Sequence, residues 1–343
     1  MTATAPAPTS TASSPSSPPP DLKHSAVGER IQDALLVLEV EQRRYGDDKE
    51  CTVITLGNAS GRLASRPFWA TEQTLIAGIA RGDVVQVIGE IDAYRGKRQL
   101  NVTSIRPLPH GSIDWHRLLP SVGDVAPYWE RLDRWRLEMQ RPRLRRVVNL
   151  FYEDEAFRER YSECPASTSG HHAELGGLLR HTCEVAAIGR AIARTCRADA
   201  ELILAGALLH DIGKLEAYTW RTGFGATECG ELLGHVALGS LMLDRRVAAC
   251  DPAPCTDQEL TLLHHFILSH HGKLEFGAPV QPMTLEADVL HFADHASAKT
   301  ASMVDALADP DNFNGDDTVT ATRLWQLDRR KAYRGKSDWG LER

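Results

Sequence analysis

The chain has 343 residues, a length sufficient for about two domains. Its 42% hydrophobic and 25% charged residues are ordinary for a soluble globular protein, and no apolar run approaches the ~20 residues of a membrane-spanning helix. The net charge of −7 argues against binding of polyanions by the whole surface. Seven cysteines, none in a CxxC pair, together with the lack of a signal-peptide pattern, predict a cytoplasmic protein with reduced thiols.

The N-terminal third predicts a tail followed by a small β-domain. Residues 1–26 are rich in Pro, Ser, Thr and Ala, which is typical of a disordered tail. Between residues 27 and 110 a short helical stretch at 73–79 follows the third of five predicted strands. The strands are separated by Gly- and Asp-containing turns and cover residues 35–42, 50–58, 61–69, 83–92 and 99–108. This order predicts an OB-fold β-barrel.

An OB-fold commonly binds single-stranded nucleic acid, because bases stack on its aromatic rings beside basic groups that meet the phosphates. The candidate contact residues in this barrel are Tyr45, Arg66, Trp69, Tyr94, Arg95 and Lys97. Aromatic rings of small barrels lie as often in the core as on the surface. OB-folds also bind proteins and sugars, so the fold alone leaves the ligand open.

Two segments concentrate basic residues. Residues 111–164 are expected to form a helical linker, in which seven arginines fall between Arg131 and Arg146 and Pro142 interrupts the helix. Residues 311–343 are expected to form a basic tail that includes Tyr333. Both segments can be explained as solvated surfaces whose arginines pair with nearby carboxylates. The neighbouring OB-fold favours a second interpretation, in which these basic residues contact nucleic acid.

The most informative feature is an ordered series of metal-ligand residue types. The series consists of His181, His210, Asp211, His235, His270, His271 and Asp294. An adjacent His-Asp pair offers an imidazole and a carboxylate from one turn, and the carboxylate can bridge two ions. The segment GALLHDIGK around this pair is apolar on nearly all sides, which predicts a buried helix whose titratable groups need partners.

Helical phasing selects among the later histidines. A capping box at Thr256 predicts a helix that ends at Gly272. His270 shares the apolar face of this helix with Leu263 and Ile267, so it is expected to point into the protein.

The same phasing leaves the role of His271 open and separates it from two earlier histidines. His271 lies about 100° further round the helix and either ligates, contacts substrate or does neither. His264 and His265 lie nearly two turns earlier, and we interpret them as residues of the helix face.

Lys214, one turn after the His-Asp pair, is either a solvated lysine at a helix end or a point charge that holds a phosphate.

The histidine and aspartate series resembles that of the HD-domain phosphohydrolases. His181, His210, Asp211 and Asp294 match the minimal set of that family, and His235 and His270 look like the extra ligands of its two-metal members. The resemblance covers roughly residues 165–305, and we place the HD domain at 165–310. The expected fold class is a multi-domain α and β protein, with an N-terminal OB-fold β-barrel followed by an all-α HD domain.

An OB-fold followed by an HD domain resembles the YhaM-type 3′-to-5′ exoribonucleases of bacteria. The stretches that carry this resemblance include SGRLASRPFW, HHAELGGLLRHT, GALLHDIGK and LSHHG. It implies hydrolysis of single-stranded RNA to 5′-mononucleotides, with single-stranded DNA as a second substrate. It also implies two divalent ions, Mn²⁺ first, with Fe²⁺, Co²⁺ or Mg²⁺ as alternatives. A homo-oligomer is left open.

The resemblance also implies roles for individual residues. Asp211 would bridge the ions, Lys214 would neutralise phosphate charge, and His171 and His172 would lie near the metal site and touch the substrate. Capping or packing is the alternative role for these two histidines. Arg180 stands where many relatives are expected to carry an acidic or neutral residue, which puts substrate detail in doubt.

Three other functions fit parts of the pattern. An HD-type nucleotide or cyclic-nucleotide phosphohydrolase would use the same site, but it would not need the barrel. A non-catalytic binding module would have lost ligands, and none of the ligand positions is missing. An HD-fold diiron oxygenase carries a similar lysine, yet it would have little use for a strand-binding barrel.

Overall fold

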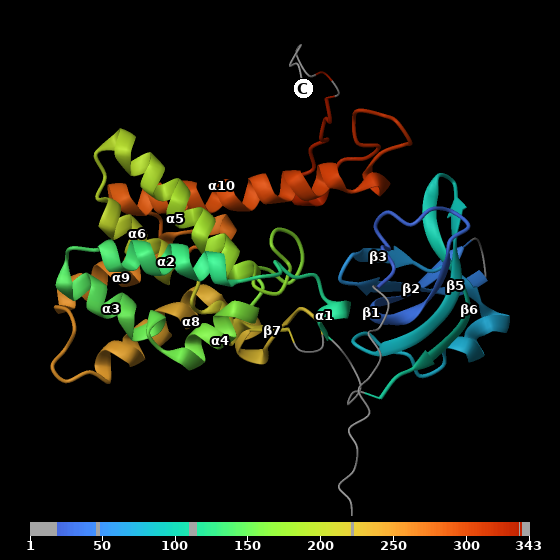
Figure 1. The fold of residues 1–343 in the computed structure, drawn as a ribbon, viewed down its shortest axis with the longest axis horizontal. Coiled ribbons are helices and arrows are strands. Elements are labelled where there is room, and N and C mark those ends of the chain that lie inside the picture. Colours follow the sequence, from blue (N-terminus) through green and yellow to red (C-terminus); the bar gives the residue numbers. More distant parts are fainter. Residues whose placement is uncertain (1–18, 46–48, 110–114, 221–222, 336, 338–343) are drawn as a thin grey trace, which may run out of the picture.

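The computed structural model describes residues 19–45, 49–109, 115–220, 223–335 and 337. These residues form a β-barrel and a larger helical body, placed side by side, with a long helix along one edge of the helical body (Figure 1). The predicted fold class, an OB-fold barrel followed by an all-α HD domain, is confirmed.

The barrel is built from one mostly antiparallel sheet. Its strands are β1 (Arg30–Tyr45), β2 (Lys49–Asn58), β3 (Gly61–Ala64), β4 (Phe68–Trp69), β5 (Val84–Tyr94) and β6 (Lys97–Pro107). The hydrogen-bonded order is β3-β2-β1-β5-β6, and β4 pairs with β2. A parallel bridge between Ser65 and Leu100 joins the two ends of this order. The 3₁₀-helix η1 (Ala70–Ile76) lies between the third strand and β5, as the OB topology requires.

One predicted strand is interrupted. The stretch 61–69 was expected to be continuous, but it is divided into β3 and β4. Pro67 stands in the gap, and proline has no N–H to donate to a sheet ladder. The barrel core is made of alternate residues such as Ile31, Leu35 and Val37, as expected for strands with one buried face.

Part of the predicted N-terminal tail is ordered, which corrects the expectation for residues 19–26. Leu22 is fully buried in the barrel core, and its N–H donates to Ser60 Oγ over 2.8 Å. Asn58 Nδ2 donates to the carbonyl of Pro20 over 2.8 Å. Burial of Leu22 together with these hydrogen bonds holds the segment on the barrel, which a composition averaged over the Pro- and Ser-rich stretch does not show. Residues 1–18 lie outside the part of the chain that the structure describes.

The remaining elements are mainly helices. They are α1 (Trp115–Leu118), α2 (Ala126–Glu138), α3 (Pro142–Tyr152), α4 (Glu155–Glu163), α5 (Gly177–Cys196), α6 (Ala200–Leu209), α7 (Lys214–Ala217), α8 (Glu228–Ala248), α9 (Asp257–Ser269) and α10 (Leu285–Ala308). A two-stranded ribbon of β7 (Tyr218–Thr219) and β8 (Gly225–Ala226) follows α7. Three 3₁₀-helices are η3 (Leu274–Phe276), η4 (Pro310–Asn312) and η5 (Trp325–Leu327). None of the helices in the described ranges is both long and apolar enough to cross a membrane.

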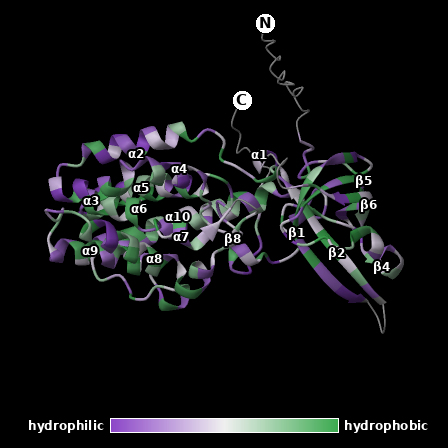
Figure 2. Ribbon diagram, turned by 90° about the horizontal axis from the view of Figure 1, so that it is seen from below, coloured by the Kyte–Doolittle hydropathy of each residue, from purple (hydrophilic) through white to green (hydrophobic). Residues whose placement is uncertain are grey.

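The helices of the predicted linker share the core of the helical body. Trp129 of α2, Tyr152 of α3 and Tyr161 of α4 belong to the same buried cluster as Leu178 and Leu208. Several linker arginines form ion pairs within the chain, including Arg136–Glu153, Arg143–Glu259 and Arg158–Asp133. In Figure 2 the centre of the helical body is largely hydrophobic, whereas α2 at its edge is mostly hydrophilic. Residues 126–163 therefore form part of the helical body rather than a spacer.

The barrel and the helical body touch through apolar and charged contacts. Leu36 and Val84 of the barrel belong to the cluster that fills the helical body. Arg98 of β6 pairs with Asp311, with distances of 3.0 Å from Nε to Oδ1 and 2.9 Å from Nη2 to Oδ2. The segment from Asp311 to residue 335, expected as a basic tail, is folded against α10, with Leu327 buried there.

Candidate metal centre

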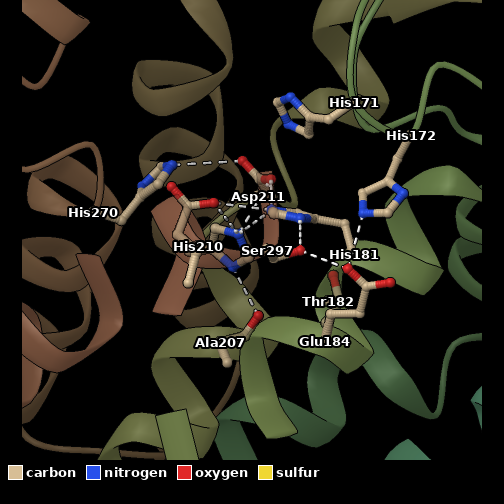
Figure 3. A network of polar contacts seen from close by, with 12 residues as sticks. His171, His172, His181, Thr182, Glu184, Ala207, His210, Asp211, His270 and Ser297 are labelled. Atoms are coloured by element: carbon tan, nitrogen blue, oxygen red, sulfur yellow. Dashed lines mark hydrogen bonds and ion pairs between the residues drawn. The ribbon is translucent and has the colours of Figure 1, made fainter. Parts of the chain in front are cut away.

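The predicted ligands converge in the middle of the helical body although they come from five helices or their ends. His181 lies on α5, His210 ends α6, His235 lies on α8, His270 ends α9 and Asp294 lies on α10. Figure 3 shows several of these side chains pointing toward one another around Asp211. His181, His210 and His270 are buried, whereas His235 and Asp294 are partly exposed. The side of the site nearest to solvent is therefore formed by His235, His271 and Asp294.

The Asp211 carboxylate lies between two groups of imidazoles. Its Oδ2 is 3.5 Å from His181 Nε2 and 3.2 Å from His210 Nε2. Its Oδ1 is 3.4 Å from His235 Nε2 and 3.6 Å from His270 Nε2. Each oxygen thus faces a different histidine pair, which is the arrangement of a bridging carboxylate.

The two groups contain further donors. Asp294 Oδ1 is 2.9 Å from His181 Nε2 and 4.0 Å from His210 Nε2, so Asp294 belongs to the first group. His271 joins His235 and His270 in the second, where one donor atom from each residue lies within 4.8 Å of the others. The structure therefore brings all seven predicted ligands together, and of the roles left open for His271 its position beside His235 and His270 favours ligation.

Hydrogen bonds to Nδ1 leave Nε2 free for metal binding. The Nδ1 atoms of His210, His270 and His271 lie 2.7–2.8 Å from the backbone carbonyls of Ala207, Ile267 and Phe276. A carbonyl oxygen can only accept, so each Nδ1 carries the proton and Nε2 of the neutral ring keeps its lone pair. Carbonyl partners of this kind orient metal-binding histidines in proteins generally.

Glycines allow the close approach that places the second group. A Cβ on Gly213 would lie 2.0 Å from the carbonyl oxygen of His235, so only glycine lets the turn after Asp211 pack against α8. Gly234 has φ of +73° and kinks α8 immediately before His235. Glycine adopts this conformation without the penalty that other residues incur. The kink directs His235 into the site.

The pKa shifts of Asp211, His235 and His271 favour the protonation states that bind metal. Burial alone would raise the pKa of Asp211, but the adjacent Lys214 ammonium opposes it, and this pKa lies well below its usual range. Burial lowers the pKa of His235 well below its usual value and lowers that of His271 to about 4. Asp211 is therefore ionised, and the imidazoles of His235 and His271 are neutral near pH 7.

The donor set fits divalent metal ions. Asp211 Oδ1 and His235 Nε2 are buried and have no hydrogen-bond partner among the described residues. Buried polar atoms of this kind are costly unless another group satisfies them, and a cation between them would do so. Five imidazoles and two carboxylates suit manganese, iron, cobalt or zinc, whereas Mg²⁺ prefers oxygen ligands throughout.

The three other residues predicted near the chemistry take different positions. Lys214 is buried, and its Nζ lies 2.6 Å from Asp211 Oδ2, so it pairs with the central carboxylate. The His171 ring lies 5.7 Å from the His181 ring, and burial lowers its pKa to about 3. His172 Nε2 lies 2.9 Å from Glu184 Oε2. His171 thus borders the site, whereas His172 contacts a carboxylate behind it.

Two residues that sequence reasoning missed support His181. Ser297 Oγ donates to Glu184 Oε2 over 2.8 Å and lies 3.0 Å from His181 Nδ1. Because the serine proton is directed to Glu184, its oxygen accepts from His181, and His181 Nε2 again faces the site. Arg180 Nε donates to Glu184 Oε1 over 3.0 Å. Both missed residues follow a ligand by three positions, Glu184 after His181 and Ser297 after Asp294, and this spacing shares a helix face.

Ser297→Ala is expected to weaken metal binding about 10- to 100-fold, because the His181 ring loses the acceptor that fixes its tautomer and orientation. Isothermal titration of the metal-free protein with Mn²⁺ measures the affinity. Ser302→Ala, a buried serine on α10 that donates to the Ala298 carbonyl, is the matched control. Equal Mn²⁺ affinity of Ser297→Ala and the parent protein would show that the hydrogen bond does not support the ligand.

Comparisons with known proteins agree with this geometry. A family model described as the HD domain matches residues 178–299. Relatives named 3′-5′ exoribonuclease YhaM include one from Bacillus subtilis strain 168, which is 30% identical over 82% of this chain and 88% of the relative. The chain belongs to the YhaM family. A YhaM relative from Oceanobacillus iheyensis is 30% identical over 90% of this chain, and one from Shouchella clausii is 29% identical over 91%. These YhaM matches cover 95% and 96% of the relatives, so they span the barrel as well as the helical body.

The YhaM-type barrel places its candidate nucleic-acid contacts in two areas. Tyr94, Arg95 and Lys97 lie together on the β5–β6 hairpin, where the Tyr94 ring is 60% exposed and the Arg95 guanidinium is 5.2 Å from its centroid. Arg66 pairs with Glu72 over 2.5 Å. Trp69 on β4 is exposed. The side chain of Tyr45 lies outside the part of the chain that the structure describes.

Proposed function

We propose that this chain is a metal-dependent 3′-to-5′ exoribonuclease that hydrolyses single-stranded RNA and releases 5′-mononucleotides. The observation that carries the proposal is the Asp211 carboxylate, whose two oxygens face two separate pairs of histidines. The printed name of the YhaM relatives supports the direction and the RNA substrate. The barrel beside the site supports a strand as the substrate rather than a single nucleotide.

Two ions would bind in the two groups. The first would be held by His181, His210, Asp211 and Asp294, and the second by Asp211, His235, His270 and His271. When bound, such ions lower the pKa of water and stabilise negative charge on phosphoryl oxygens. Mn²⁺ is the ion that we propose first, and Fe²⁺ and Co²⁺ suit the same donors.

Residues of the chain perform the remaining tasks. Lys214 keeps Asp211 ionised through their 2.6 Å contact and adds positive charge near the position of the phosphate. His171, beside His181, contacts the terminal nucleotide, and its low pKa leaves it as a neutral hydrogen-bonding group. His172 acts as a positioning residue, since its hydrogen bond lowers the pKa of Glu184 to about 2 although burial opposes this. Glu184 can then accept the Ser297 proton at any pH at which the enzyme works.

The barrel would hold the upstream strand. Tyr94 offers a stacking face, and Arg95 and Lys97 offer charge to phosphates on the same hairpin. Stacking and backbone contacts discriminate little between sequences, so weak sequence preference is expected. Single-stranded DNA offers the same bases and phosphates, and it is proposed as a poorer second substrate.

A time course on 5′-labelled single-stranded RNA with Mn²⁺ tests this function, with matching DNA and a chelator control in parallel. We expect a ladder that shortens progressively from the 3′ end and depends on the metal, with 5′-mononucleotides as products. Intact RNA together with hydrolysis of nucleotides or cyclic nucleotides would replace this proposal by a small-molecule phosphohydrolase. Cleavage within the strand would exclude an exonuclease.

A further inference from the structure

We propose that the segment from Arg323 to Arg334 is a second single-strand-binding surface, which guides RNA from the barrel to the metal site with Trp325 as its stacking platform. This inference rests on the proposed function. The segment lies outside residues 178–299, which match the HD domain.

The segment is folded, and it exposes aromatic and basic side chains. Antiparallel bridges join Leu324 to Arg330 and Val319 to Tyr333, while Leu324, Leu327 and Ala332 pack against Ala306 of α10. On this base Trp325 is 65% exposed and Tyr333 is 67% exposed. Large exposed rings cost hydration free energy, which a stacked base would remove.

The charge of this segment is opposite to that of the whole chain. It holds five basic residues, Arg323, Arg329, Arg330, Lys331 and Arg334, and one acidic residue, Asp328. Asp328 is itself paired with Lys299 of α10 over 2.5 Å. In a chain with a net charge of −7, a local excess of positive charge beside exposed rings matches a single strand, which presents phosphates and base faces alternately.

Trp325 packs beside Gly170, the residue that precedes His171. A Cβ on Gly170 would lie 3.6 Å from Cη2 of the Trp325 ring, so the indole tip packs beside this glycine. His171 follows directly, and its ring is 5.7 Å from that of His181. A base stacked on Trp325 would therefore lie close to the nucleotide that enters the site.

The C-terminal region, which comprises residues 309–335 and includes the proposed surface, contacts the barrel near its start. Asp311, at the start of the region, pairs with Arg98 of β6, and Arg98 follows Lys97 of the β5–β6 hairpin. Figure 1 shows the C-terminal region at the end of α10 near this hairpin. The C-terminal region therefore connects the proposed barrel contacts to the site.

Fluorescence anisotropy of a labelled 20-nucleotide single-stranded RNA, with a chelator present to prevent cleavage, tests the surface in the full chain. Trp325→Ala is expected to weaken binding about tenfold, because one stacked base is lost. Trp325→Phe should restore most of the affinity because it keeps a ring. Leu137→Ala is the matched control, since Leu137 on α2 is 60% exposed and lies outside this surface.

The basic residues are tested by salt dependence. For Arg329→Gln combined with Lys331→Gln, the slope of log affinity against log salt should become shallower by about 0.7 for each phosphate contact removed. An unchanged slope, or parental affinity of Trp325→Ala, would overturn the surface. If Trp325→Ala lost RNA binding while the parent protein failed to degrade RNA in Mn²⁺, the surface would be supported and the proposed function would be overturned.

Discussion

Asp211→Asn is expected to lower the rate of RNA hydrolysis about a thousandfold or more. The substitution removes the negative charge that faces both histidine groups, so each of the two proposed ions would lose an anionic ligand. It also leaves the buried Lys214 ammonium without its carboxylate partner, which should cost about 3–5 kcal/mol of stability. Progressive shortening of 5′-labelled RNA and thermal unfolding measure the two effects.

A double variant separates chemistry from folding. Asp211→Asn combined with Lys214→Met removes the unpaired ammonium, so thermal stability should return toward that of the parent protein. Activity should remain lost, because the Asp211 charge and the Lys214 charge near the phosphate are both absent. Recovery of activity together with stability would show that Asp211 serves the fold and not the reaction.

His235→Ala is expected to reduce bound Mn²⁺ from two ions per chain to one and to lower activity about a hundredfold. His235 Nε2 faces only the Asp211 Oδ1 side of the carboxylate, so its loss should weaken the second group and leave the first. Metal content measured after dialysis against Mn²⁺ counts the ions. The fold should tolerate the change, because His235 is partly exposed and its Nε2 has no hydrogen bond to lose.

His265→Ala is the matched control for this variant. His265 lies on α9 close in sequence to the ligands, but its Nε2 accepts from the Met283 N–H over 3.0 Å and it belongs to neither imidazole group. Two ions per chain are expected in this control. Two ions in His235→Ala as well would contradict the assignment of His235 as a ligand.

The convergence of the candidate ligands could be predicted from sequence because it depends on residue type, order and helical phase. His270 was separated from His264 by the apolar face of α9, and the structure agrees: His264 bonds Ser240 Oγ instead. The same rule could have found Glu184 and Ser297, which follow ligands by three positions. They were missed because serine and glutamate are common on helix faces, and only their contacts with residues of another helix show that these two support His181.

For the barrel, too, the strand order could be predicted from sequence, whereas contacts between distant residues could not. Alternating strands and turn residues predicted its order, since side-chain direction alternates along any strand. The burial of Leu22 and the contact between Arg98 and Asp311 join residues far apart in the chain. Local composition suggested a disordered tail at one place and a basic tail at the other, because it does not contain such distant contacts.

The sequence by itself determined that this is an OB-fold joined to an HD domain with seven candidate metal ligands, because periodicity and residue type are local properties. Only the tertiary structure decided that Asp211 turns one oxygen to each histidine pair, that Lys214 pairs with this carboxylate, and that Trp325 packs beside Gly170. These facts depend on distances between side chains from separate helices. Packing of the whole core sets such distances, and no short stretch of the chain encodes them.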